Sequence, residues 1–276
     1  MIIFPFTVDV PMQRWPWANW VLIAVTVIVS VAVWFDKDHS LSDDEANQIA
    51  VYLEQTQPLN LERINRYSPH ELTREDVKWT ADGARAFLRG AFTHPLALHP
   101  ADFRWWQPVT NLFVHSHWLL LLGNMVFLFC FGNAVNAKLG HLLYLFFYLG
   151  LGVVTDLDVV LAASPVPSMG ASGAIMGIMG VFAVLYPRND VQIYYLVWAG
   201  QRFTGVWHIS SFFVIIAYLV LDLIKLRTEG LLATGLIAHL LGMFTGMLIT
   251  ILLVHYDLIK MERGEENLLQ WMGWKT

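Results

Sequence analysis

The sequence predicts an all-α integral membrane protein, a bundle of six transmembrane helices with a partly helical extramembrane insert between the first two. Apolar residues make up 56% of the 276 residues and charged residues only 14%, and the mean hydropathy is +0.51. Six long runs contain no Asp, Glu, Lys or Arg, whereas residues 36–104 are as charged as a soluble domain. This pattern excludes a soluble enzyme, a disulfide scaffold and a nucleic-acid binder.

The six uncharged runs give the predicted spans, since a helix needs roughly 20 apolar residues to cross the hydrocarbon layer. In chain order the predicted spans are residues 15–35, 109–135, 142–160, 170–186, 207–226 and 231–256. The third and fifth extend past the end of their uncharged run and include Asp156, Asp158, Asp222 and Lys225. The fourth is short, because roughly 16 residues reach only about 24 Å of a layer near 30 Å thick. We therefore expect the N-terminus of this span to start below the membrane surface.

The charge pattern also predicts four parts of the chain. These are an N-terminal lead with span 1 (1–35), an extramembrane insert that forms a long first outer loop (36–104), a membrane domain with spans 2–6 (105–256) and a cytoplasmic tail (257–276). Within the insert, Ser42 to Glu45 form a capping-box pattern before a helical run, and residues 73–92 have helical apolar spacing.

The orientation follows from Lys and Arg in the short segments, which favour the cytoplasmic side. With the N-terminus inside, the inner segments hold seven such residues and the outer ones two. The inner residues are Arg14, Lys138, Arg188, Arg202, Lys260, Arg263 and Lys275, and the outer ones are Lys225 and Arg227. We therefore expect both termini in the cytoplasm and the start of span 4 facing outward. The absence of glycosylation sites and of a transit peptide favours a bacterial inner membrane.

Ser172 is the first polar candidate, because it lies in the sequence Gly170-Ala171-Ser172-Gly173 at the start of span 4. The free N–H groups and the positive dipole end of a helix N-terminus would stabilise a developing anion there. The same small residues also fit close helix packing without any chemistry, a reading that Gly177 and Gly180 would support.

His239 and Asn124 are the other two polar candidates inside apolar spans. His239 lies in span 6 beside a GxxxG pattern, Gly242 and Gly246, which predicts close packing against a glycine-bearing neighbour such as span 4. A neutral imidazole there could activate a serine, or could simply bind a backbone carbonyl. Asn124 lies in span 2, where its amide could stabilise an oxyanion or form an interhelical hydrogen bond.

Together these motifs resemble the rhomboid intramembrane serine proteases. A GxSG motif opens span 4, AHxxGxxxG lies in span 6, and a His-containing stretch leads to an Asn in span 2. The resemblance implies that Ser172 is the nucleophile and His239 the general base of a dyad without an acidic third member. It implies that Asn124 and the backbone N–H of Ser172 hold the oxyanion, with Gly170, Gly173, Gly242 and Gly246 packing the site.

The sequence departs from the family pattern at several positions. His115 fills the first of two His positions before the Asn and is a possible supporting residue, but Leu120 occupies the second. Part of the family's oxyanion site is therefore missing. Met176 stands where an aromatic ring often supports the His, and Trp106-Gln107 replaces a common Trp-Arg pair. His117 is too far along the helix to replace the lost His.

The predicted function is therefore that of an intramembrane serine endopeptidase that cleaves transmembrane or juxtamembrane segments of single-span membrane proteins. The expected partners are these substrates and the lipid bilayer, with no cofactor, no metal and no nucleic acid. A catalytically silent rhomboid-like protein that binds or sorts transmembrane clients is the alternative that Leu120 keeps open, and a transporter or channel has less support. Asp156, Asp158 and Asp222 are expected near the membrane interface, in structural or solvated roles.

Overall fold

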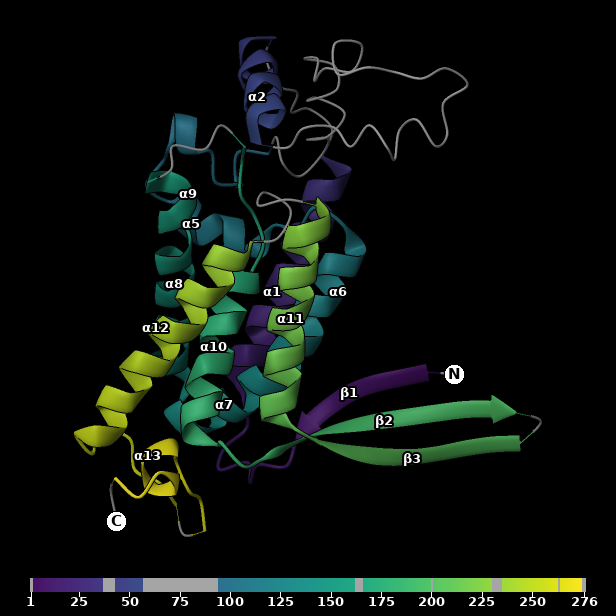
Figure 1. Cartoon of the computed structure of the whole chain (residues 1–276), viewed down its shortest axis with the longest axis vertical. Helices are drawn as coiled ribbons and strands as arrows, with labels where there is room; N and C mark the ends of the chain where they lie inside the picture. The colour runs from purple at the N-terminus through teal and green to yellow at the C-terminus, as the bar shows by residue number, and fades with distance from the viewer. Residues whose placement is uncertain are drawn as a thin grey trace.

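The computed structural model describes residues 2–36, 43–56, 94–161, 166–199, 201–229, 235–262 and 264–274. These residues are mostly helical, and the long helices run side by side in one bundle (Figure 1). This confirms the predicted helical class. Three strands form a small antiparallel sheet at one end of the bundle, which the sequence did not predict.

Four helices of the described residues are long and apolar enough to cross a membrane. They are α1 (Trp17–Phe35), the continuous run Trp118–Leu139, the run His141–Leu161 and α12 (Leu236–His255). Two shorter apolar helices, α10 (Ser172–Leu185) and α11 (Ser211–Glu229, apolar to Ile224), fall at the predicted spans 4 and 5. Four long spans and two short ones follow the predicted order, and the count of six crossings stays a prediction.

The second span is interrupted by a π-helical turn. It consists of α6 (Trp118–Phe127), the π segment η4 (Leu128–Gly132) and α7 (Asn133–Leu139). A π turn leaves backbone carbonyls without their usual partners. The buried Asn19 of α1 supplies such a partner, because its Nδ2 donates to the carbonyl of Leu128 (2.9 Å). The same Nδ2 also donates to Asn133 Oδ1 (2.8 Å). This bond network ties α1 to the second span.

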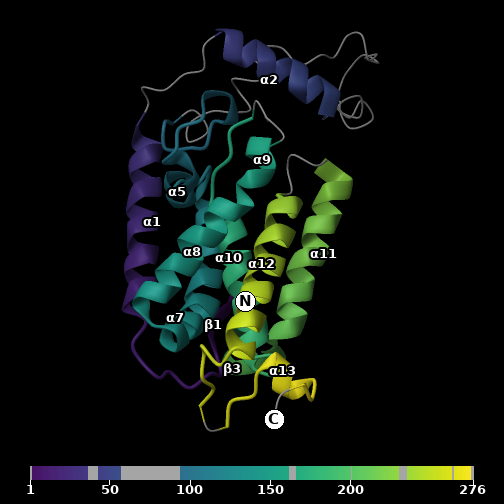
Figure 2. The ribbon, with the colours of Figure 1, turned by 90° about the vertical axis from the view of Figure 1, so that its left-hand side faces the viewer.

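Helix α10 is the buried centre of the bundle, between α8 (His141–Thr155) and α12 (Figure 2). Every residue of α10 from Gly173 to Leu185 except Ala183 is buried. A Cβ atom added at Gly242 would lie 2.3 Å from the Gly173 carbonyl oxygen, and one at Gly246 would lie 2.2 Å from that of Gly177. Only glycine allows this approach, so the GxxxG pattern of α12 packs directly on the α10 backbone.

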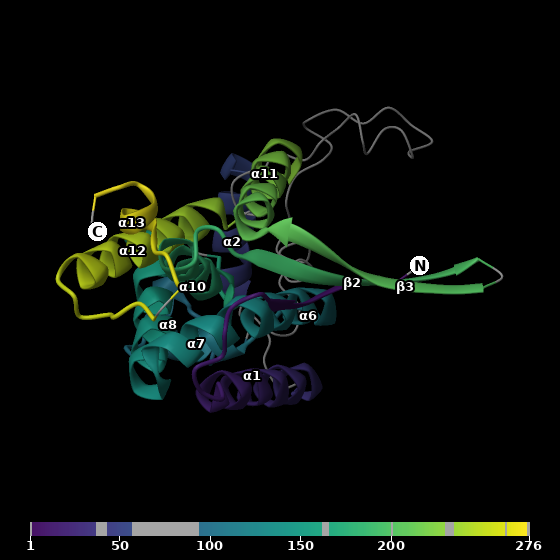
Figure 3. The same cartoon turned by 90° about the horizontal axis from the view of Figure 1, so that it is seen from below.

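The sheet contains β1 (Ile2–Val8), β2 (Asp190–Ala199) and β3 (Gln201–Ser210) in the order β1-β2-β3, with both pairs antiparallel. It projects sideways from the bundle (Figure 3). The prediction that span 5 begins at Trp207 is wrong, because Trp207 pairs with Ile193 in the sheet and α11 begins at Ser211. Strands β2 and β3 are rich in β-branched and aromatic residues, which favour extended structure.

Short helices cover the two ends of the bundle. At the end where α10 begins lie α2 (Asp43–Thr56), η2 (Pro100–Asp102), α5 (Gln107–Thr110), η3 (Asn111–Phe113) and α9 (Leu157–Leu161). At the opposite end lies α13 (Leu268–Trp271). A capping box of Asn267 and Gln270 caps the start of this helix. Helix α2 begins at Asp43, within the predicted capping-box pattern, whose Ser42 lies outside the described residues. The helix predicted over residues 73–92 also lies outside the described residues.

Candidate active site

The backbone enters α10 through a glycine turn that brings Ser172 to the first position of the helix. Gly170 has φ +111°, a conformation that other residues rarely adopt, and its N–H donates to the Asn111 carbonyl (3.0 Å). Ser172 itself is half-buried, while the next residues are buried. The first N–H groups of a helix have no partner inside it, so this turn presents donors and the positive dipole end beside the serine hydroxyl.

The loop before α6 holds this turn in place. Leu98 and Ser168 form an isolated antiparallel bridge, with N–H to carbonyl distances of 2.9 and 2.8 Å in the two directions. Asn111, whose carbonyl accepts from Gly170, donates through Nδ2 to the buried Asp156 carboxylate at 2.9 Å. Asp156 therefore has the structural role that the sequence predicted for it, since it fastens the loop to the end of α8.

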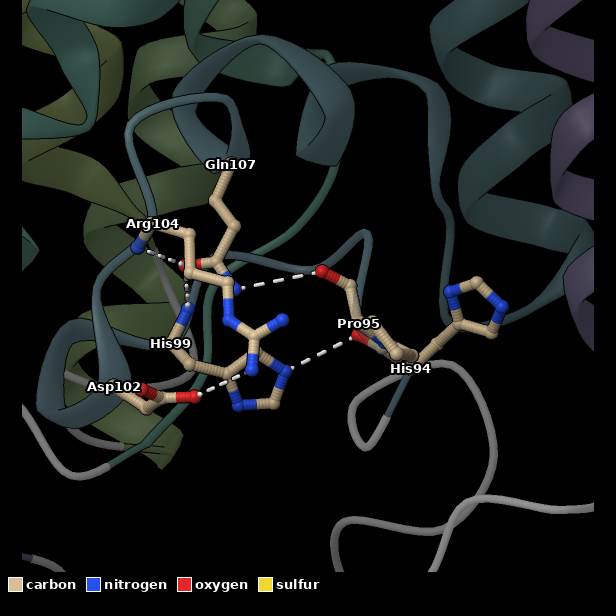
Figure 4. A network of polar contacts seen from close by, with 6 residues as sticks. All are labelled: His94, Pro95, His99, Asp102, Arg104 and Gln107. Atoms are coloured by element: carbon tan, nitrogen blue, oxygen red, sulfur yellow. Dashed lines mark hydrogen bonds and ion pairs between the residues drawn. The ribbon is translucent and has the colours of Figure 1, made fainter.

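The side chain of Gln107 fastens the loop of residues 95–104, as Figure 4 shows. Its side chain is 1% exposed, and its Oε1 accepts from the N–H groups of His99 (3.3 Å) and Arg104 (3.1 Å). Its Nε2 donates to the Pro95 carbonyl at 3.4 Å. The amide thus supplies both donor and acceptor to backbone groups, and a guanidinium, which has no acceptor, could not make the first two bonds.

His239 lies at the N-terminal end of the α10–α12 contact, at the level of Ser172. The paired contacts of Gly173 with Gly242 and of Gly177 with Gly246 show that the two helices run parallel in fixed register. Ser172 lies one residue before the first contact on α10, and His239 lies one turn before it on α12. No hydrogen bond joins the Ser172 hydroxyl to the imidazole among the described residues, so the dyad stays a prediction.

The imidazole of His239 contacts two side chains of α11 that the sequence analysis did not place in the site. Its Nδ1 lies 2.6 Å from Asp222 Oδ2, and the ring of Tyr218 makes an edge contact with a centroid distance of 5.4 Å. Of the two roles predicted for Asp222, structural or solvated, the solvated one is wrong, because the residue is 2% exposed and bonded to His239. Tyr218 supplies the aromatic support that Met176 cannot.

One sequence signal could have identified these residues. Asp222 is a lone carboxylate that follows an otherwise uncharged helical run, and such a residue usually has a specific partner. Tyr218 precedes it by four residues and so lies on the same helix face.

Asn124 is held by a chain of hydrogen bonds that starts on α1. The Ser30 hydroxyl donates to the Phe113 carbonyl (2.9 Å), so its oxygen accepts the Nδ1–H of His115 (3.0 Å). The Nε2 atom of His115 then accepts from Asn124 Nδ2 at 2.9 Å. One amide hydrogen of Asn124 is thus bonded to His115, and the second can donate to another acceptor, such as a substrate oxygen.

His115 lies before the first residue of the second span and is fully buried. Burial, and to a smaller extent the nearby His117, lower the pKa of His115 to about 4. The imidazole is therefore neutral at pH 7, which matches the donor at Nδ1 and the acceptor at Nε2. His115 thus has a geometric basis for the supporting role that the resemblance implies.

Replacing His115 by phenylalanine is expected to lower kcat roughly tenfold with little change in KM, because Asn124 would lose the bond that orients its amide. The measurement is steady-state cleavage of a model single-span substrate in liposomes. His117→Asn is the matched control, since His117 caps α6 by accepting from the Leu120 N–H (3.2 Å) and Asn can do the same. Equal rates for wild type and His115→Phe would exclude this role.

Leu120 lies beside the glycine turn, since a Cβ atom added at Gly170 would lie 4.0 Å from Leu120 Cδ2. A histidine at this position would place a ring near the start of α10. Leu120→His is therefore expected to raise kcat about tenfold by adding an oxyanion donor, measured in the same cleavage assay. An unchanged rate would show that Asn124 and the backbone suffice.

No group of three or more His, Cys, Asp or Glu side chains that could hold a metal ion occurs in the part of the chain that the structure describes. The candidate side chains of the site are the hydroxyl of Ser172, the imidazoles of His115 and His239, the amide of Asn124 and the carboxylate of Asp222. These groups suit acid–base and nucleophilic chemistry.

Comparison with known proteins shows the family of the chain. Residues 102–256, more than half of the chain, match the rhomboid domain family. A protein of Bacillus subtilis (strain 168) named "Putative rhomboid protease YdcA" is 29% identical over 157 residues, which cover 56% of this chain and 70% of that protein. The chain belongs to the rhomboid family and is a multi-pass membrane protein.

Two further relatives match over shorter stretches. The rhomboid protease GluP of Bacillus subtilis (strain 168) is 36% identical over 86 residues, 31% of this chain and 16% of that protein. The rhomboid-like protein 11, chloroplastic, of Arabidopsis thaliana is 40% identical over 81 residues, 28% of each chain. The chain thus spans less than a third of either of these two relatives.

Proposed function

We propose that this protein is an intramembrane serine endopeptidase that uses Ser172 as nucleophile and His239 as general base. The observation that carries the proposal is the fixed register of α10 and α12, in which the backbones touch at Gly173 and Gly242. This contact supports a close approach of the hydroxyl and the imidazole, which lie just outside it on the two helices. Hydrogen bonds between such groups are often long before substrate binds.

In the proposed reaction, Ser172 Oγ attacks the carbonyl carbon of the scissile peptide bond while His239 Nε2 accepts the hydroxyl proton. The imidazolium then gives this proton to the leaving amine, and a water molecule hydrolyses the acyl-enzyme by the same route. The bond of Nδ1 to Asp222 supports this assignment, because it leaves Nε2 as the ring atom that can accept the proton.

The negative oxygen of the tetrahedral intermediate needs donors that are already oriented. The free amide hydrogen of Asn124 and the N–H of Ser172 at the helix N-terminus are proposed for this role. The bond of Asn124 to His115 supports it, because an amide that is held by one hydrogen does not have to reorient during the reaction.

The proposed substrates are single-span membrane proteins whose outer half is weakened by Gly, Ala, Ser or Pro, because a helical carbonyl is already hydrogen-bonded and hidden. Cationic residues at the opposite end of the bundle support an outward-facing site. Arg14 lies against the turn at Gly140, Lys138 pairs with Glu265, and Arg188 pairs with Glu266 at 3.2 Å. We place that end in the cytoplasm of a bacterial inner membrane.

The test is cleavage of two model substrates by the purified protein in liposomes, one with a Gly-Ala-Ser outer half and one with an all-Leu span. We expect cleavage of the first substrate only, with product masses that place the cut near the outer membrane face. A serine-directed fluorophosphonate should stop the reaction, and a metal chelator should leave its rate unchanged. Binding of the substrate without cleavage would instead favour a client-binding protein.

A further inference from the structure

The carboxylate of Asp222 is buried in the bundle with His239 as its bonding partner. Asp222 is 2% exposed and His239 is 5% exposed, and Oδ2 of the first lies 2.6 Å from Nδ1 of the second. Within the described residues, no Lys or Arg forms an ion pair with this carboxylate. Burial of a carboxylate among apolar helices costs several kcal/mol unless a hydrogen bond compensates it, so this contact is a specific one.

The contact determines which ring nitrogen carries the proton. An ionised carboxylate only accepts hydrogen bonds, so Nδ1 of His239 carries the hydrogen when Asp222 is ionised. In the neutral imidazole, Nε2 then has a free lone pair. This atom lies at the outer end of α12, 3.7 Å from the position that a Cβ atom at Gly235 would occupy.

Tyr218 restrains the orientation of the His239 ring. The edge contact with Tyr218 restrains its plane, and Tyr218 in turn packs edge-on against Phe127 of α6 at 5.2 Å. Tyr218 and Asp222 lie one turn apart on α11, so a single helix holds both the ring plane and the ring proton. A purely structural ion pair would not need this second restraint.

We propose that Asp222 is a positioning residue that holds His239 in the Nδ1–H tautomer and completes a Ser172–His239–Asp222 triad. The proposal rests on the proposed protease function. In the reaction, Asp222 accepts the Nδ1–H bond throughout and keeps its own charge, so it stabilises the imidazolium that forms when Nε2 takes the serine proton. The resemblance to rhomboid proteases implies a dyad, and the contact with α11 extends it.

The test compares Asp222→Asn and Asp222→Glu in the liposome cleavage assay. Asparagine has the same shape but can donate to the ring and favours the wrong tautomer, so kcat should fall at least about a hundredfold with KM unchanged. Glutamate only accepts, so it should retain more activity than asparagine although it packs less well. A merely structural role predicts the reverse order, because the isosteric variant would then be the milder one.

Asp158→Asn is the matched control for charge. Asp158 is close enough to His239 to interact with its charge, but its carboxylate accepts from the Val159 N–H instead (2.6 Å). The control should stay within about twofold of wild type, since it removes a charge and no bond to the ring. Wild-type kcat in Asp222→Asn, or a loss of kcat that parallels a loss of thermal stability, would overturn the proposal.

A measurement without turnover separates this proposal from the proposed function. Nitrogen-15 NMR of the wild-type protein, assigned with a His239→Gln variant, should show a protonated Nδ1 and an unprotonated Nε2 at His239. Asp222→Asn should lose this pattern. If wild type cleaves substrate and its His239 has the opposite tautomer, only the triad fails, and if the tautomer is as expected but no substrate is cleaved, only the protease function fails.

Discussion

Replacing Ser172 by alanine is expected to lower kcat at least about 10⁴-fold, and replacing His239 by alanine is expected to lower it to a similar extent. The two residues would act as one unit, so the double variant should be little worse than either single one. Cleavage of the Gly-Ala-Ser substrate in liposomes measures all three variants, with the fraction of correctly folded protein checked by thermal unfolding.

Ser211→Ala is the matched control for this experiment. Ser211 is also the first residue of an apolar helix, α11, but it lies at the opposite end of the bundle. It should keep wild-type kcat. If Ser172→Ala retained more than about a tenth of wild-type activity, another group would have to supply the nucleophile, and an additive loss in the double variant would separate His239 from Ser172.

Replacing Gly242 by valine is expected to slow cleavage strongly and to destabilise the protein. Even a single methyl group at this position would lie 2.3 Å from the Gly173 carbonyl oxygen, so α12 must move away from α10. Overpacking of this kind typically costs about 2 kcal/mol. A displacement of about 1 Å between nucleophile and base is expected to lower kcat roughly a hundredfold. Thermal unfolding and substrate cleavage measure the two effects.

Gly150→Val is the matched control, because Gly150 lies in the middle of α8 and nothing lies within 4 Å of an added Cβ atom. The same loss of glycine in a helix occurs there without the contact between backbones. Wild-type activity in Gly242→Val would contradict the register on which the proposed site depends. Equal effects of the two substitutions would show that the packing contact contributes nothing specific.

The sequence predicted the parts of the site that local patterns determine. Glycines at helical spacing, such as Gly242 and Gly246, require a close neighbour, and the short run after Gly170 indicates where α10 begins. These patterns do not show which groups approach from other helices. The contact of His239 with Asp222 joins α12 to α11, and the bond of His115 to Ser30 joins the outer loop to α1.

The sheet and the start of α11 could not be predicted from hydropathy alone. From Phe203 onward β3 carries no charged residue and continues directly into α11, so the end of the strand from Trp207 merged with the helix that follows it. Apolar content does not distinguish a strand from a buried helix over short lengths.

The most direct test of the central claim is the residue that a fluorophosphonate labels in the wild-type protein, identified by mass spectrometry of the digested adduct. Labelling requires a serine that a base has activated, so it reports on Ser172 and His239 together and needs no substrate. We predict an adduct on Ser172 in the wild type and at least about a hundredfold slower labelling in His239→Ala. Labelling of a different residue, or equal labelling of Ser172 in both proteins, would contradict the assignment of Ser172 and His239 as nucleophile and base.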